Sequence, residues 1–407
     1  MNRIYPTCTA VLLAVAIVLY GNPATASRTE CSAVDTLVEG NSAFAVKLYR
    51  ELGAANGNLL FSPYGVSSAL AMTYAGAREN TAVEMKAALD FQLDPPDLHT
   101  AFNRLNRKLT AGARKTGQRM NIANALCLTG GDVDRAFKAL LKENYNAEIF
   151  TGGIDRINGW VRRQTEGNIE RIMETLDPQS VCVLLNAVYF KGVWERRFAD
   201  EQTHEAPFRL SSREQVTARL MYRKDRYRCL TKTDVQAVAL PYKGEALSMV
   251  VLLPRDVDGL GELEKRLTTE TLMQWLSELD AASVQEMELF LPKFRMETGH
   301  DLVPPLKTLG MKDGFDPAGK ADFRGMGGAK GALWISQIKH KAVMDVNEAG
   351  TEAAAATAVE MALTSVREYP VFRADHPFIF LIREHATGSI LFMGRLADPR
   401  DLQDGKR

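Results

Sequence analysis

The chain has 407 residues, of which 46% are hydrophobic and 25% are charged, so it is long enough and apolar enough to bury a large core. Its 50 basic residues balance 50 acidic ones, which gives no reason to expect nucleic acid or an acidic membrane surface as a partner. The composition indicates an ordinary globular protein, and its function has to be sought in local motifs.

The first 26 residues differ from the rest of the chain. Arg3 precedes an apolar run at residues 10–20, and Ala24-Thr25-Ala26 has the small-x-small pattern of a signal peptidase site. The run is too short to span a bilayer, so residues 1–26 are predicted to be a cleaved signal peptide. We therefore expect a secreted, extracellular protein with a single domain at residues 27–407.

Four cysteines remain after this signal peptide is removed. In an oxidising compartment four cysteines allow three disulfide pairings, and free buried thiols are the alternative. Their spacing matches no metal motif, so we expect no metal and no cofactor. They are Cys31, Cys127, Cys182 and Cys229.

The first structured stretches lie before residue 76. Residues 34–52 carry helical periodicity. Residues 58–75 predict a short strand, a Ser-Pro turn and a buried helix, with Ser62 ahead of Pro63 as the helix N-cap.

A strongly basic stretch follows at residues 104–119 and contains no acid. One interpretation is a solvated helix and loop. The other is a binding site for a heparin-like polyanion, although Gly112 and Gly117 interrupt it. Its basic residues are Arg104, Arg107, Lys108, Arg114, Lys115 and Arg119.

Strands and helices then mix without the regular alternation of a doubly wound fold. A helix is predicted near residues 157–169 and an alternating strand at residues 184–194. The predicted class is α+β. Further strands are expected at residues 237–240, 248–253 and 286–294, and further helices at 260–279 and 302–309.

The motifs of common hydrolases are missing from the sequence. Residues 65–69, GVSSA, lack the second glycine of a nucleophile elbow. His204-Glu205 is followed by Ala206-Pro207 and no second histidine, so it is not a zinc-protease helix. The chain is therefore not expected to be an enzyme.

The most informative stretch follows a predicted strand at residues 335–346. After Gly350 the side chains are small almost without interruption, which is typical of a surface helix because alanine has the best helix propensity. Such narrow side chains would equally suit a segment that slides between two strands of a sheet. Gly350 would then be the hinge, because glycine tolerates the backbone angles of a moving junction.

This stretch resembles a known family. Residues 347–357, NEAGTEAAAAT, are similar to the proximal hinge of inhibitory serpins, and residues 372–399 resemble the C-terminal signature of that family. The resemblance implies a serpin fold with three β-sheets, about eight or nine helices and an exposed reactive-centre loop at about residues 348–371. It also implies a monomer that traps a target serine protease as a covalent complex.

The resemblance assigns roles to particular residues. Lys293 and Glu348 match a salt bridge at the top of the main sheet, near Trp194. Ser62, Asn186 and His340 match a hydrogen-bonded group, called the shutter, beneath the centre of that sheet. The hinge would consist of Glu348, Gly350, Thr351, Glu352, Ala353, Ala354, Ala355, Ala356 and Thr357.

Counting along the loop as in the family places the cut at Thr364–Ser365, which suits an elastase-like protease, whereas cleavage after Leu363 would suit a chymotrypsin-like protease. Cleavage next to Leu363 or Arg367 is the alternative, and Arg367 would attract trypsin-like enzymes. The other interpretation of the whole chain is a non-inhibitory serpin used for carriage, storage or signalling. Members of that kind tend to carry charged, proline-rich or bulky hinge residues, which residues 353–357 do not.

Overall fold

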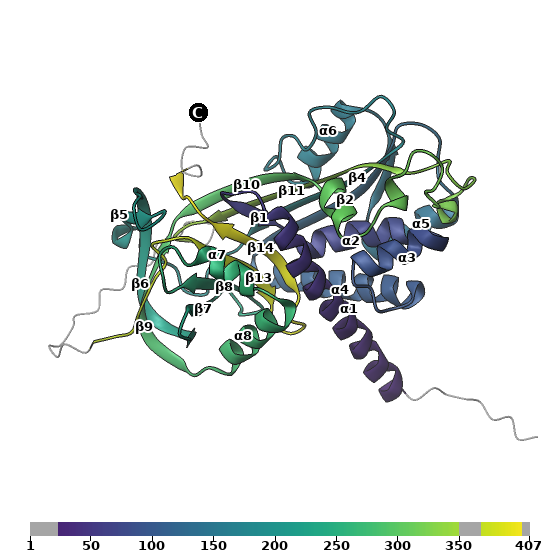
Figure 1. Cartoon of the computed structure of the whole chain (residues 1–407). Helices are drawn as coiled ribbons and strands as arrows, with labels where there is room; N and C mark the ends of the chain where they lie inside the picture. The colour runs from purple at the N-terminus through teal and green to yellow at the C-terminus, as the bar shows by residue number, and fades with distance from the viewer. Residues whose placement is uncertain (1–22, 350–367, 401–407) are drawn as a thin grey trace, which may run out of the picture.

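The computed structural model describes residues 23–349 and 368–400, which Figure 1 traces. Residues 1–22, with most of the predicted signal peptide, lie outside the described residues, as do residues 350–367 and 401–407. Helix α1 (Pro23–Leu52) begins before the predicted cleavage point at residue 26 and continues into the domain.

A five-stranded sheet carries the candidate site. Strands β11 and β4 are parallel neighbours, and β4 is buried along nearly its whole length. Burial on both faces explains why β4 reads as a nearly continuous apolar run. The strand order is β10 (Phe294–Asp301), β11 (Ile335–Val346), β4 (Cys182–Lys191), β2 (Arg119–Leu128) and β3 (Glu148–Thr151).

The remaining nine strands form one hydrogen-bonded sheet that bends at β6. Residues 220–228 of β6 pair with β9, and residues 228–231 pair with β7, so this long strand joins the strands on its two sides into one hydrogen-bonded sheet. The strand order is β1 (Leu59–Phe61), β14 (Ile390–Leu396), β13 (Phe378–Glu384), β8 (Leu247–Pro254), β7 (Val235–Pro241), β6 (Gln215–Thr231), β9 (Val284–Pro292) and β12 (Val371–Arg373), and β5 (His204–Arg209) pairs with β6.

Helices cover both faces of the five-stranded sheet. Helix α2 packs beneath β2 and β4 and reaches β14, whereas α6 packs on β2 from the opposite face (Figure 1). The mixture of sheets and helices confirms the predicted α+β class. Besides α1, the helices of the described residues are α2 (Pro63–Tyr74), α3 (Glu79–Ala88), α4 (Pro95–Thr116), α5 (Arg135–Tyr145), α6 (Ile154–Gln164), α7 (Leu260–Arg266), α8 (Thr269–Ala281) and α9 (Val303–Thr308).

Two local differences from the sequence analysis have clear causes. The helix expected at residues 260–279 is two helices, because the Thr268 side chain accepts a hydrogen bond from the Thr271 N–H and starts α8 anew. Strand β6 was not predicted, because basic and aromatic residues crowd its centre and hide the alternating pattern.

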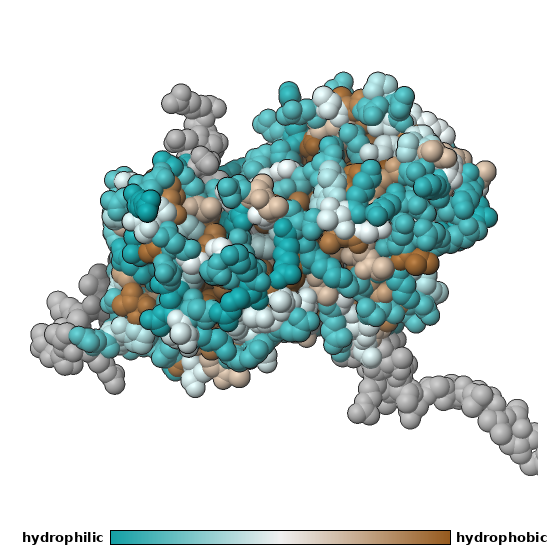
Figure 2. All heavy atoms as spheres, in the orientation of Figure 1, coloured by the Kyte–Doolittle hydropathy of each residue, from teal (hydrophilic) through white to brown (hydrophobic). Residues whose placement is uncertain are grey.

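Hydrophilic residues cover most of the face shown in Figure 2, and apolar residues are scattered between them. Within residues 23–349 and 368–400, no helix is long and apolar enough to cross a bilayer.

Candidate functional site

The candidate site lies where β4 and β11 end at the same edge of their sheet. Their parallel pairing, with Met344 opposite Phe190, carries both chains out in the same direction. The residues that follow β11 then meet the residues that follow β4. The Trp194 indole Nε1–H donates to the carbonyl of Asn347 over 2.9 Å, and the Trp194 backbone N–H donates to the carbonyl of Ala349 over 3.4 Å.

The backbone carbonyl of Glu348, between those of Asn347 and Ala349, is held as well. It accepts a hydrogen bond from the backbone N–H of Phe198 over 2.9 Å. Three consecutive carbonyls, from residue 347 to residue 349, are thus fixed to the segment after β4. Trp194 is itself held rigidly, since its ring stacks on Tyr242 with centroids 4.5 Å apart and 7° between the planes.

An ion pair reinforces this junction. The Lys293 Nζ lies 2.7 Å from Oε2 of Glu348, whose side chain is 8% exposed. Burial acts to raise the pKa of Glu348, but hydrogen bonds from Lys293 and the backbone outweigh it and hold the pKa below its usual value. Glu348 is therefore a carboxylate at neutral pH. Its ion pair with Lys293 holds the turn at residues 348–349, directly before residue 350.

A second cluster lies in the middle of the sheet, where β11, β4 and the start of α2 meet. The backbone N–H of Ser62 donates to Nε2 of His340 over 3.0 Å, so the proton of a neutral ring resides on Nδ1. His340 Nδ1–H then donates to Oδ1 of Asn186 over 2.6 Å. The Ser62 hydroxyl donates to the carbonyl of Leu391 and accepts from the N–H of Gly65.

The His340 ring is neutral for a physical reason. Burial, assisted by the neighbouring His300, holds the pKa of His340 well below its usual value, although a hydrogen bond with Asn186 works in the opposite direction. Because Nε2 is an acceptor for Ser62, the cluster requires this neutral form.

Sequence reasoning missed two members of this network. The Asn186 Nδ2 donates to Oδ1 of Asn124 on β2, and Asn124 Nδ2 donates to the hydroxyl of Ser68 on α2. Ser68 follows Ser62 by about two turns on α2, whereas Asn124 lies far from the shutter residues in sequence. Only the pairing of β2 with β4, with Asn124 directly opposite Asn186, brings Asn124 into the network. A polar residue within the apolar half of β2 was the available signal.

Gly65 is explained by the space around it. A β-carbon there would lie 2.8 Å from Oδ1 of Asn186, 2.9 Å from Cγ2 of Val188 and 3.0 Å from Oγ of Ser62. In this chain glycine allows α2 to approach β4 closely.

Most of the expected hinge and cleavage residues lie outside the described residues. Glu348 alone of the hinge set is described. The residues that lie outside the described part of the chain are Gly350, Thr351, Glu352, Ala353, Ala354, Ala355, Ala356 and Thr357 of the hinge, and Leu363, Thr364, Ser365 and Arg367 around the expected cut.

The basic stretch is divided between two elements. Arg107 and Lys108 are exposed on α4 and Arg104 is half-buried there. Arg119 starts β2 and pairs with Glu166 at 3.3 Å. The side chains of Arg114 and Lys115 are outside the described residues.

The cysteines and the possible metal ligands form no further site in the described part of the chain. Cys127, Cys182 and Cys229 are free thiols, and the side chain of Cys31 lies outside the described residues. Within the same residues, no group of three or more metal-binding side chains gathers.

Comparison with known proteins decides the family. The model of the serpin (serine protease inhibitor) family matches residues 39–399. The chain belongs to the serpin family. Leukocyte elastase inhibitor of Bos taurus is 40% identical over 90% of this serpin and 100% of that protein, and Serpin B6 of Macaca fascicularis is 38% identical over the same shares.

Solved serpin structures agree with this fold. The native state of the thermophilic serpin tengpin superposes with a TM-score of 0.80, at 27% identity, over 89% of this chain and 94% of that one. Serpins inhibit serine proteases through a covalent complex and are not enzymes, which confirms the prediction that this chain is not an enzyme.

The prediction of a secreted, extracellular protein is wrong by the same comparison. Leukocyte elastase inhibitor and Serpin B6 belong to a clade of serpins that is intracellular. An apolar run near the N-terminus was weak evidence for secretion, because hydrophobicity and a small-x-small pattern occur in many N-terminal segments.

Proposed function

We propose that this serpin is a suicide substrate of an elastase-like or chymotrypsin-like serine protease and is cleaved at Thr364–Ser365. The observation that carries the proposal is the parallel pairing of β4 with β11, because the loop leaves directly from the end of β11. A segment that turns back after β11 runs antiparallel to both strands. It therefore fits between them as a new central strand.

The energy for such an insertion follows from the hydrogen bonds of a sheet. About 15 inserted residues span roughly 50 Å at about 3.3 Å per residue. Each ladder hydrogen bond contributes about 0.5–1.5 kcal/mol net, so the sum is on the order of ten kcal/mol. Antiparallel pairs are also slightly more stable per residue than the parallel pair that they replace.

The residues of the loop support fast insertion. Gly350 is the pivot, Thr351 the first inserted side chain, and residues 353–357 carry no bulky or charged group that would delay entry. The 40% identity to a leukocyte elastase inhibitor supports an elastase-like target. Leu363 and Arg367 remain the alternative residues before the cut.

The test is incubation of the full chain with elastase-like, chymotrypsin-like and trypsin-like proteases. We expect a complex that survives denaturant, together with a released peptide that begins at Ser365. Cleavage of the loop without such a complex, by every protease of the panel, would contradict the proposal and support a non-inhibitory serpin. The mass of the released peptide separates the three cleavage positions.

Polyanion binding and a monomeric state belong to the same proposal. Arg107 and Lys108 are exposed on α4 and would contact a heparin-like chain. Elution of the protein from a heparin column at low salt, equal to that of the Arg107→Ala/Lys108→Ala variant, would rule this site out. Light scattering of the free protein measures the oligomeric state.

A further inference from the structure

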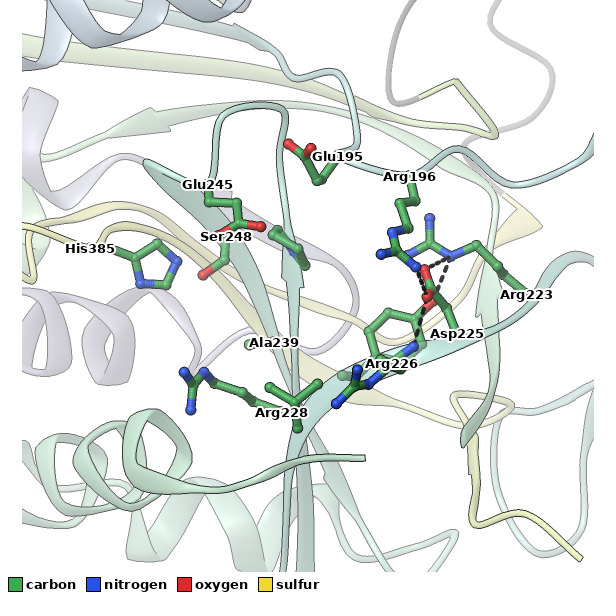
Figure 3. A pocket seen from close by; sticks show the side chains of 13 residues that line it. Glu195, Arg196, Arg223, Asp225, Arg226, Arg228, Ala239, Glu245, Ser248 and His385 are labelled. Carbon is green, nitrogen blue, oxygen red and sulfur yellow. Dashed lines mark hydrogen bonds and ion pairs between the residues drawn. The ribbon is translucent and has the colours of Figure 1, made fainter. Parts of the chain in front are cut away.

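A cavity of about 500 Å³ opens beside the segment that follows β4 (Figure 3). It lies at the bend of the nine-stranded sheet, where Arg228 of β6 pairs with Ala239 of β7 and with Val284 of β9. Its volume is in the range of sites that hold small molecules. None of the residues assigned above to the hinge, the shutter or the cleavage site lines it.

Arginines dominate the charge of the cavity. Arg196 and Arg223 both direct their guanidinium groups at Asp225 in Figure 3, and each forms an ion pair with that carboxylate. Within the described residues, no ion pair or hydrogen bond engages the side chain of Arg226. In the same part of the chain, the guanidinium of Arg228 donates to the backbone carbonyls of residues 280 and 282 and to no carboxylate.

The acids of the cavity leave part of this charge without a counter-charge. Besides Asp225, Glu195 and Glu245 line the cavity. In Figure 3 Glu245 lies beside Ser248, and Glu195 lies between that pair and Arg196, with its carboxylate directed away from Arg196. Glu195 accepts a hydrogen bond from the Gly244 N–H over 2.7 Å. One carboxylate therefore faces several guanidinium groups at the arginine end.

Two buried polar atoms at the cavity lack hydrogen-bond partners. They are Nη1 of Arg223, a residue that is 9% exposed, and Oγ of Ser248, which is 1% exposed. The Arg223 guanidinium is held between the rings of Phe198 and Tyr227, at 4.7 Å and 5.2 Å from their centroids. Its charge is fixed and shielded from water, and this increases its attraction for an anion.

We propose that this cavity binds a small organic anion. Arg196 and Arg226, which are exposed, donate hydrogen bonds to the anionic group, and the buried charge of Arg223 attracts it from behind. Arginine suits this role because its planar group pairs with carboxylate, sulfonate and phosphate oxygens in a bidentate manner. Ala239, Pro241 and Val284, which also line the cavity, contact the carbon skeleton of the ligand.

The test is isothermal titration of the full chain with 1-naphthalenesulfonate as the probe. We expect one site per molecule, and at least tenfold weaker binding of the neutral 1-naphthalenemethanol. Titrations with 1-naphthoate and 1-naphthyl phosphate show which anionic group is preferred. Sodium sulfate, which lacks the carbon skeleton, should bind more weakly than the sulfonate.

Variants locate the binding. The Arg196→Ala/Arg226→Ala variant should bind the sulfonate at least tenfold more weakly, since charged hydrogen bonds are lost. Arg226→Glu alone changes an exposed side chain and keeps the test informative if the double variant unfolds. Arg213→Ala, which removes an exposed arginine in the turn before β6, is the matched control and should bind like the parent.

Absence of binding by all four charged probes overturns the proposal, as does equal affinity in Arg226→Glu and Arg213→Ala. No protease takes part in this experiment, so its failure leaves the proposed inhibition untouched.

Discussion

Ser62 donates its backbone N–H to Nε2 of His340 over 3.0 Å, although 278 positions separate the two residues in the chain. The same ring donates from Nδ1 to Asn186 of the neighbouring strand β4. One neutral imidazole thus ties the start of α2 to two adjacent strands. A protonated ring has no acceptor for Ser62, so the contact is lost when His340 gains a proton.

We expect the protein to lose stability as the pH falls below about 6.5, the usual pKa of histidine in an unfolded chain. Burial lowers the pKa of His340, so below pH 6.5 the unfolded chain binds a proton that the folded protein excludes. This histidine alone should lower the free energy of unfolding by about 1.4 kcal/mol at pH 5.5 relative to pH 7.5. Urea midpoints at the two pH values measure the effect.

The control for this prediction is His340→Gln. His99 and His300 also have lowered pKa values because they are buried, and they remain in both proteins. The difference between the two pH profiles therefore reports His340. Parallel profiles would show that the ring does not couple stability to pH.

Gly65→Ser should destabilise the protein by about 1–3 kcal/mol, the usual cost of overpacking a core. The new β-carbon would lie within 3.0 Å of Asn186, Val188 and Ser62. Gly112→Ala is the matched control, because no atom lies within 4 Å of a β-carbon there. Gly112 belongs to α4, so this change should stabilise the protein by about 0.5–1 kcal/mol. Equal effects of the two substitutions in urea unfolding would contradict the steric argument.

Lys293→Met should cost about 1–3 kcal/mol, because the buried carboxylate of Glu348 loses its charged partner. Lys138→Met breaks the pair with Asp132, whose side chain is 69% exposed, and should change stability by less than about 0.5 kcal/mol. Thermal denaturation of both variants compares them directly. A smaller effect at Lys293 than at Lys138 would exclude a structural role for the Lys293–Glu348 pair.

Ala354→Arg should convert the proposed inhibitor into a substrate. A long charged side chain in the hinge slows insertion, so the protease completes hydrolysis and leaves. The number of serpin molecules consumed per molecule of protease inhibited should rise several-fold, whereas Ala354→Ser should leave it near the parent value. Retention of full inhibitory efficiency by Ala354→Arg would count against insertion of this segment.

Local patterns were sufficient to predict the elements that carry the site. Alternation was used to predict β11 and β4, although β4 is buried on both faces, and Ser62 ahead of Pro63 marked the start of α2, where Ser62 is the N-cap. These features depend on neighbouring residues, which a sequence displays directly.

Contacts made over long separations were not predictable in this way. Asn124 joins the shutter only because β2 and β4 pair with Asn124 opposite Asn186. The arginines of the cavity lie on β6 and on the segment after β4, and these two segments are far apart in sequence and meet where Arg196 pairs with Asp225. The secretion prediction was wrong for another reason, because it relied on an N-terminal pattern with low specificity.

The parallel pair of β4 and β11 also affects the lifetime of the uncut, active form of the protein. Nine register pairs join the two strands, and they must separate before a third strand can enter between them. If the uncut form is held by this barrier, its working life is a rate and not an equilibrium property. Unfolding rates rise about 3–6-fold per 10 °C, so modest warming would shorten the shelf life of the active form well before any loss of structure was visible at equilibrium.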